Sequence, residues 1–185
     1  RGYAGDFEML DQICTHHVCD HPLGAAWDRF FQAQAAPQAV RNRTGLIAGA
    51  VARFVRDCGA APVHVVSVGS GPAIDLERAC VALTETERQR MRITLLDLDP
   101  VALDHARLRL SALGDRQQLH LVRENLFRLA QPGRSHDALR EVDFLICSGL
   151  FDYLDEVATA AMLSHFWGSI RPAGQALVFN FAPHN

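Results

Sequence analysis

From residue 62 onward, short and almost wholly apolar runs alternate with segments of helical periodicity, and this alternation constrains the fold most strongly. Runs this apolar are typical of strands that are covered on both faces. Because strands alternate with helices, we expect right-handed βαβ units and an α/β fold with a Rossmann-like, doubly wound, mostly parallel sheet. The five expected strands are Val63–Val68, Ile93–Leu96, Leu119–Val122, Phe144–Cys147 and Ala176–Phe181.

The stretch before this alternation is helical in character. A first apolar stripe at helical spacing consists of Phe7, Leu10, Cys14 and His17. The segment Pro22-Leu23-Gly24 indicates a loop, and a longer helical pattern over residues 47–58 ends at Gly59, a residue type common just past helix ends. We therefore expect an N-terminal helical cap over residues 1–60 and a Rossmann-like core over residues 61–185.

Composition excludes several classes of protein. The 185 residues are enough for one sizeable core, and the formal net charge of −3 is not that of a nucleic-acid-binding protein. No apolar run reaches the length of a membrane span, and no signal peptide opens the chain. Five scattered cysteines without a CxxC pair predict reduced thiols and a cytoplasmic location. The first residue is Arg rather than Met, so we expect the start to be trimmed.

The strongest local signal follows the first expected strand, where Gly69-Ser70-Gly71-Pro72-Ala73 leads into a helix. The two glycines remove side chains, so backbone can approach a ligand closely. The following helix N-terminus offers backbone N–H groups to a carboxylate or phosphate. The turn therefore predicts a ligand site, and an ordinary strand-to-helix turn is the alternative interpretation.

An acidic residue ends the second expected strand. Asp97 lies 26 positions after Gly71, and an acid at this strand tip can accept hydrogen bonds from both hydroxyls of a ribose. The alternative role of helix cap fits Asp99 better, because Asp99 directly precedes Pro100. We therefore expect Asp97 to bind the ribose of a nucleoside cofactor.

Three further motifs follow the later expected strands. They are Arg123-Glu124-Asn125-Leu126-Phe127, Cys147-Ser148-Gly149-Leu150-Phe151-Asp152-Tyr153-Leu154 and Arg171-Pro172-Ala173-Gly174-Gln175. With the glycine turn and the acidic strand end, they make residues 62–182 resemble the class I S-adenosylmethionine (SAM)-dependent methyltransferases. The resemblance implies SAM as the cofactor and methyl transfer to a small molecule as the reaction.

The resemblance also implies which residues hold the cofactor. The glycine turn faces the methionine part, the acidic strand end binds the ribose, and Leu98 flanks the adenine. Asn125 lies near the adenine amino group with Leu126 beside it, while Ser148 contacts the methionine part or the substrate. The implied cofactor-binding residues are Gly69, Ser70, Gly71, Asp97, Leu98, Asn125, Leu126 and Ser148.

The sequence departs from the family pattern at three positions. Ser67 stands where the family often has an acid, and Ala73 and Ala173 stand where glycines are common. Other uses of SAM, such as aminocarboxypropyl transfer or cyclisation, remain alternatives, and Ser67 favours a third one, a non-catalytic SAM-binding module. A dehydrogenase is disfavoured because the turn lacks the GxGxxG spacing. Class I enzymes usually carry two more strands, so we expect the C-terminal strands to be missing after residue 185.

A narrower resemblance concerns the possible methyl acceptor. Short motifs resemble a bacterial subgroup described as extracellular-factor or 3-hydroxypalmitic acid methyl ester biosynthesis proteins, which implies a hydroxylated fatty acid carboxylate as the acceptor. These motifs are Arg1-Gly2-Tyr3-Ala4-Gly5-Asp6, His21-Pro22-Leu23-Gly24, Arg41-Asn42-Arg43, Leu150-Phe151-Asp152-Tyr153-Leu154 and Asn180-Phe181-Ala182-Pro183.

Several side chains are candidates for contacts with the substrate. Arg41 and Arg43 are either binders of an anionic substrate group or a solvated helix face. Asp6 is either a ligand contact or the cap of the following helix. A hydroxyl or amine acceptor would need a general base, whereas a carboxylate would not. The candidates for this catalytic role are Tyr3, Asp6, Tyr153, Asp152 and His165.

A cluster of cysteines and histidines invites a zinc interpretation, but its spacing does not support one. The cluster consists of Cys14, His16, His17, Cys19 and His21, and no second group of ligands follows it. We therefore expect no metal. The oligomeric state is open, with a homodimer among the options.

Overall fold

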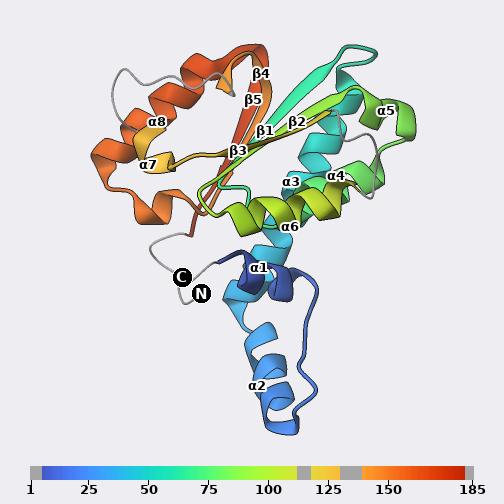
Figure 1. Cartoon of the computed structure of the whole chain (residues 1–185), viewed down its shortest axis with the longest axis vertical. Helices are drawn as coiled ribbons and strands as arrows, with labels where there is room; N and C mark the ends of the chain where they lie inside the picture. The colour runs from blue at the N-terminus through green and yellow to red at the C-terminus, as the bar shows by residue number, and fades with distance from the viewer. Residues whose placement is uncertain (1–5, 112–117, 130–138, 182–185) are drawn as a thin grey trace.

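The computed structural model describes residues 6–111, 118–129 and 139–181. Five parallel strands form one sheet in the order β3-β2-β1-β4-β5 (Figure 1). The strands are β1 (Val63–Val68), β2 (Met91–Asp97), β3 (Leu119–Arg123), β4 (Val142–Ser148) and β5 (Ile170–Phe179). The expected α/β class and the Rossmann-like parallel sheet are confirmed.

Helices cover both faces of the sheet. They are α1 (Phe7–Cys14), α2 (Pro22–Gln32), α3 (Ala35–Asp57), α4 (Ile74–Ala82), α5 (Glu85–Gln89), α6 (Pro100–Ser111), α7 (Leu126–Leu129) and α8 (Glu156–Ser169), with the 3-10 helix η3 (Phe151–Tyr153). One core cluster joins α3, α4 and α6 to one face, and a second joins α8 to the other. Figure 1 shows the two helical layers on opposite sides of the strands.

The central strand β1 explains why the sequence folds in this way. All six of its residues are buried, so both faces of the strand need an apolar cover. Val65 contributes to one core cluster, whereas Val66 contributes to the other. Phe144 of β4 is fully buried and meets the ring of Phe54 on α3 edge-on, with ring centroids 5.2 Å apart.

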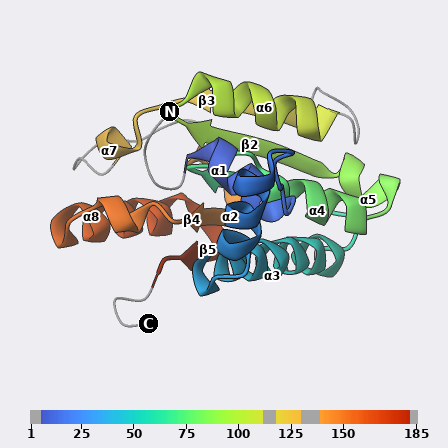
Figure 2. The same cartoon turned by 90° about the horizontal axis from the view of Figure 1, so that it is seen from below.

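The N-terminal helices are attached to the sheet through α3. The second half of α3, including Val51 and Val55, belongs to the same core cluster as β1 and β4. Helix α2 extends away from the sheet in Figure 1, and it lies in front of the other elements in Figure 2, where the molecule is seen from below. The division into a cap and a core near residue 60 stays a prediction, since α3 contributes to both parts. Within the described residues, we find no helix that is both long and apolar enough to cross a membrane.

Two local expectations for this region are wrong. His17 does not extend the first helical stripe, because α1 ends at Cys14 and His17 is exposed beyond it. The segment Pro22-Leu23-Gly24 is the first turn of α2 rather than a loop. Proline is favourable at that position, because its fixed φ suits a helix and its missing N–H has no partner there anyway. The expected end of α3 at Gly59 is confirmed, with a φ of +60°.

A bulge shapes the start of β5. The register between β4 and β5 shifts between Val142 and Phe144, and Ala173 takes a left-handed φ of +68°. Next to it, a Cβ on Gly174 would lie 2.6 Å from a methyl carbon of Ile170 and 2.9 Å from the backbone oxygen of Asp143. Because one of these neighbours is backbone, only glycine fits there without a shift.

We expect Gly174→Ala to lower the free energy of unfolding by about 1–3 kcal/mol, because the new methyl group forces β4 and β5 apart. The matched control is Gly168→Ala in α8, where an added Cβ meets nothing within 4 Å. This control should gain about 0.5–1 kcal/mol from helix propensity. Urea denaturation of both variants checks the pair, and equal effects would contradict the steric argument.

A buried histidine links three strands at the amino edge of the sheet. His64 of β1 lies with its Nε2 2.9 Å from Thr94 Oγ1 and its Nδ1 2.9 Å from an Nη of Arg92. Its backbone N–H donates to Asp143 at 2.7 Å. Burial, and next the positive charge of Arg92, lower the pKa of His64 below its ordinary value, whereas the Glu141 carbonyl and the Asp143 charge act against this shift.

This lowered pKa predicts a pH dependence of stability. In the unfolded chain, His64 binds a proton as pH falls below about 6.5. In the folded chain its lower pKa keeps it neutral to a lower pH, so the free energy of unfolding decreases as pH falls. We expect the loss between pH 7.5 and pH 5.5 to be smaller in His64→Gln than in the wild type. Urea titrations at both pH values test this, and an identical loss would show that His64 does not carry the effect.

Candidate functional site

The order of the strands creates a crevice at one edge of the sheet. β1 and β4 are neighbours, but β1 leads into α4 on one face while β4 leads through η3 into α8 on the other. In open parallel sheets, ligands bind at such a switch point, beyond the carboxyl ends of the strands. The glycine turn after β1 and Ser148 at the end of β4 both lie there.

The glycine turn has the backbone conformation that its sequence predicts. Gly69 and Gly71 take left-handed φ values of +65° and +50°. Ala73 is also left-handed, with φ +51°, so the alanine keeps the conformation usual for glycine at some strain. The turn is tied to β2, because the N–H groups of Gly69 and Ser70 both donate to the backbone oxygen of Leu96, at 2.8 and 3.1 Å.

Asp97 fixes the same turn through its side chain. One carboxylate oxygen accepts the N–H of Gly71 at 2.9 Å, and the other accepts the N–H of Asp99 at 3.0 Å. Each oxygen keeps further acceptor capacity. Burial raises the pKa of Asp97, while these backbone hydrogen bonds oppose the rise. Asp99 accepts the N–H of Val101 at 2.9 Å at the start of α6, which is the capping role expected for it.

The remaining residues implied to bind the cofactor gather around this edge. Leu98 is half exposed, at 50%. Leu126 is buried, and its Cδ1 lies 3.5 Å from the position of a Cβ on Gly69. Asn125 follows β3, whose Arg123 pairs in register with Asp97. The structure thus brings the ends of β1, β2, β3 and β4 to one edge, as the motif order predicts.

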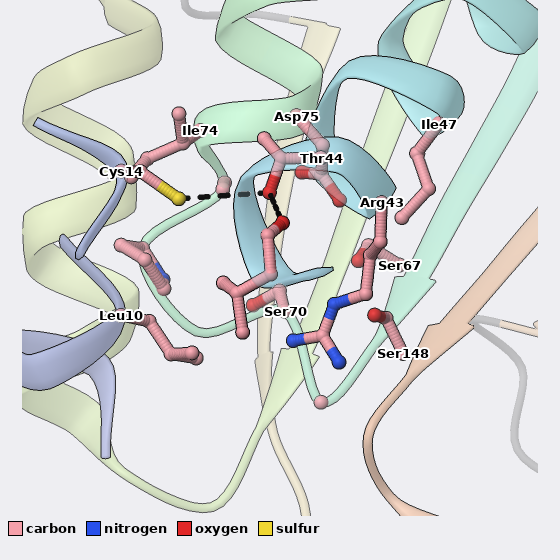
Figure 3. Close-up of a pocket in the computed structure, with 14 residues that line it drawn as sticks. Leu10, Cys14, Arg43, Thr44, Ile47, Ser67, Ser70, Ile74, Asp75 and Ser148 are labelled. Atoms are coloured by element: carbon pink, nitrogen blue, oxygen red, sulfur yellow. Dashed lines mark hydrogen bonds between the residues drawn. The ribbon is translucent and has the colours of Figure 1, made fainter. Parts of the chain in front are cut away.

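A hollow that is partly open to solvent lies beside the glycine turn, and its empty space, open solvent included, is about 440 Å³. Figure 3 shows that its walls come from α1, α3, the turn, the start of α4 and the end of β4. The hydroxyls of Ser70 and Ser148 are buried in this part of the chain without a hydrogen-bond partner. Asp75 and Thr44 also line the hollow, and no sequence motif pointed to either of them.

The cap helix α1 is held over the turn by an arginine on α6. Arg109 pairs with Asp11 of α1 and, at 2.6 Å, with Glu77 of α4. In this position of α1, the Cδ1 of Leu10 lies 3.7 Å from where a Cβ would be if Gly71 carried a side chain. Because a single guanidinium joins three helices, the position of α1 depends on it.

We expect Arg109→Gln to loosen α1, because Asp11 and Glu77 lose a charge-assisted hydrogen bond each, at a cost of about 2 kcal/mol. Hydrogen exchange of the α1 amides should then speed up more than that of β1. The control is Arg107→Gln on the same helix, whose exposed pair with Asp104 is 3.5 Å long and contributes little. Equal exchange rates in the two variants would show that the ion pairs of Arg109 do not hold α1 in place.

The candidates for a catalytic role that the structure describes do not lie together in one site. Tyr3 lies outside the described residues. Asp6 caps α1 by accepting the N–H of Met9 at 2.8 Å, which is the alternative role considered for it. Tyr153 is about half exposed, at 52%. Asp152 accepts the side-chain amide of Asn180 at 2.6 Å. His165 lies five residues before the start of β5, at the opposite edge of the sheet.

The two candidate arginines on α3 have different surroundings. Arg41 donates to the side chain and the backbone oxygen of Gln32, at 2.7 and 2.8 Å, so its guanidinium holds α2 against α3. Arg43 points into the hollow instead (Figure 3).

The cysteine and histidine cluster has local partners. Cys14 lies 3.6 Å from the Thr44 hydroxyl, and Cys19 lies 3.8 Å from the His21 carbonyl oxygen. In the part of the chain that the structure describes, no three such side chains are arranged to hold a metal ion.

No family model matches the sequence, and no curated protein sequence does either. Among solved structures, the chain is similar to a possible exported protein from Bordetella parapertussis, with a TM-score of 0.71 and 23% identity over 94% of this chain and 53% of that one. It is also similar to an O-methyltransferase family protein from Burkholderia thailandensis, with a TM-score of 0.54 and 17% identity over 85% of this chain and 42% of the other.

A third similar structure is the glycopeptide N-methyltransferase MtfA complexed with S-adenosyl-L-methionine. The TM-score is 0.50 and the identity 16%, over 71% of this chain and 53% of that one. The chain spans about half the length of these three structures. At such identities the likeness shows the fold alone, a Rossmann-like α/β fold shared with these structures.

Proposed function

We propose that the chain is the SAM-binding part of a methyltransferase that acts on a small molecule. The observation that carries this proposal is the crevice between β1 and β4, where a left-handed glycine turn is hydrogen-bonded to the acidic end of β2. The same fold holds SAM in the complexed glycopeptide N-methyltransferase.

The residues present fit such a cofactor. The turn brings bare backbone to the hollow, and the left-handed φ values of Gly69 and Gly71 disfavour side chains there. Asp97 keeps acceptor capacity for ribose hydroxyls, and the buried hydroxyls of Ser70 and Ser148 need a polar partner. In this assignment Leu98 flanks the adenine, and Asn125 with Leu126 lies at its amino edge.

The bound cofactor would supply an activated methyl group, so the protein's task is alignment and the exclusion of water. The glycine turn would hold the methionine part of the cofactor and Asp97 its ribose, at a fixed spacing. Helix α1 covers the turn through Leu10, and Arg109 keeps it there, so this cap shields the site from solvent.

The methyl acceptor is a finer part of the proposal. A carboxylate, such as that of a hydroxylated fatty acid, would need no general base. This acceptor class agrees with the described candidates, because Asp6 is occupied as a helix cap and His165 lies at the far edge. Tyr153 and Asp152 remain beside the end of β4 as positions for a base if the acceptor is a hydroxyl or amine.

We also propose a cytoplasmic location. All five cysteines are free thiols, and Cys14, Cys80 and Cys147 are buried. Burial raises the pKa of Cys80 to about 11 and that of Cys147 to about 12, so these thiols stay protonated and inert. Free thiols are typical of a reducing compartment.

We expect S-adenosylhomocysteine to bind the purified chain with micromolar affinity in calorimetric titration, and Asp97→Ala to weaken it about tenfold or more, because a charged acceptor of the ribose is lost. Asp104→Ala is the matched control, because that carboxylate is exposed on α6. Thermal unfolding establishes that both variants fold.

With SAM and an acceptor panel that starts from hydroxylated fatty acids, mass spectrometry should detect a product heavier by one methyl group. A well-folded wild-type chain that fails to bind S-adenosylhomocysteine would contradict the proposal. Binding without any methylated product would favour the non-catalytic binding module instead.

A further inference from the structure

The hollow beside the glycine turn contains a cation from the cap. Arg43 extends from α3 toward the end of β4, where its Nη1 lies 3.2 Å from the position of a Cβ on Gly149 (Figure 3). Among the described residues, none places a hydrogen-bond acceptor or a carboxylate in bonding distance of this guanidinium. Arg43 therefore differs from Arg41, which is fully engaged with Gln32.

Burial makes this cation energetically unusual. Desolvation lowers the pKa of Arg43, while the negative charges of Asp75 and, less strongly, of Asp152 oppose that shift. A guanidinium stays protonated at any physiological pH, so it cannot escape desolvation by losing its charge. A partly buried cation of this kind is stabilised by an anion that can accept from its planar fork of donors.

The same hollow contains a carboxylate. Asp75 lies in the first turn of α4, where its Oδ1 accepts the neighbouring N–H of Leu76 at 2.8 Å. Burial raises its pKa, and the charges of Arg43 and Arg78 act in the opposite direction. Asp75 and Arg43 attract each other without forming an ion pair. The hollow thus offers one positive and one negative group at separate points of its wall.

Two hydroxyls complete the polar lining. Ser70 is 9% exposed, and among the described residues neither its Oγ nor the Oγ of Ser148, both of them buried, has a hydrogen-bond partner. A hydroxyl can donate to a carboxylate and accept from an ammonium group. The lining therefore matches a small zwitterion, whose two charges would satisfy the arginine, the aspartate and both hydroxyls together.

We propose that Arg43 binds the α-carboxylate and Asp75 the α-ammonium group of the amino-acid end of the cofactor. This inference rests on the proposed function, because it assigns the zwitterionic half of SAM to the hollow and the nucleoside half to Asp97. The two residues then make the site select SAM and S-adenosylhomocysteine over adenosine thioethers that lack the amino-acid group. The cap contributes directly to cofactor recognition through Arg43.

The test compares two ligands that share the nucleoside and differ in the zwitterion. S-adenosylhomocysteine carries it, and 5′-methylthioadenosine does not. We expect Arg43→Met and Asp75→Asn each to raise the Kd of S-adenosylhomocysteine about tenfold to a hundredfold, the range for a lost charge-assisted hydrogen bond. The Kd of 5′-methylthioadenosine should stay within about twofold of the wild-type value, because the nucleoside contacts are intact.

The decarboxylated analogue of S-adenosylhomocysteine keeps the ammonium group and separates the two roles. Arg43→Met should leave its Kd unchanged, whereas Asp75→Asn should raise it. Arg41→Met is the matched control on the same helix, and both ligands should bind it as they bind the wild type. Thermal unfolding of each variant verifies that it folds.

The failures of the two proposals are distinguishable. If the wild type binds both ligands equally, or if Arg43→Met weakens both to the same extent, the zwitterion assignment is overturned and the nucleoside site stands. If the folded wild type binds neither ligand, the proposed function fails and this inference fails with it.

Discussion

The hydrogen bonds that tie the glycine turn to the end of β2 are the constraint on which the site depends. Leu96 accepts two N–H groups of the turn through its backbone oxygen, and Asp97 accepts a third through its side chain. These bonds fix where the chain leaves β1, and so where α4 begins. Asp75 lies in the first turn of that helix, so its carboxylate reaches the hollow only because the turn is held in this conformation. Ala73 adopts a left-handed backbone in the same turn, which shows that the hydrogen bonds outweigh the strain of about 1 kcal/mol.

The N-terminal helices are part of the site because α3 belongs to two environments at once. Its second half packs in the core with β1 and β4, so the helix has a fixed position against the sheet. Arg43, in its first half, therefore projects to a defined place beside the end of β4. Helix α1 is short and is held through Arg109, which suits a segment that covers a ligand and has to admit it. In the proposed assignment, α3 would recognise the ligand through Arg43, and α1 would cover it.

The sequence predicted those features that local patterns determine. Apolar runs located the strands, because strands in the middle of a covered sheet are mostly apolar, and the turn motif located the crevice. The sequence named Arg43 only as one of two candidate anion binders, because its direction follows from how α3 packs. Asp75 lies outside every motif, so no pattern pointed to it. Pro22 was misjudged because proline is typical both of loops and of the first turn of a helix. Asp6 had two acceptable roles in the sequence, and only the contact with Met9 assigns it to the helix end.

The position of the Asp75 carboxylate gives a reason why residue 67 is a serine rather than the acid that is common in the resembled family. An acid at Ser67 would lie inside a strand buried on both faces, where a carboxylate loses its hydration and meets few donors. Asp75 lies at the N-terminal turn of α4 instead, where backbone N–H groups and the helix dipole favour a negative charge. Burial still raises the pKa of Asp75, so its carboxylate is not fully compensated by the protein. Because Arg43 is also only partly compensated by the protein, a zwitterionic ligand would stabilise both groups, and binding energy and folding stability are linked through the same pair.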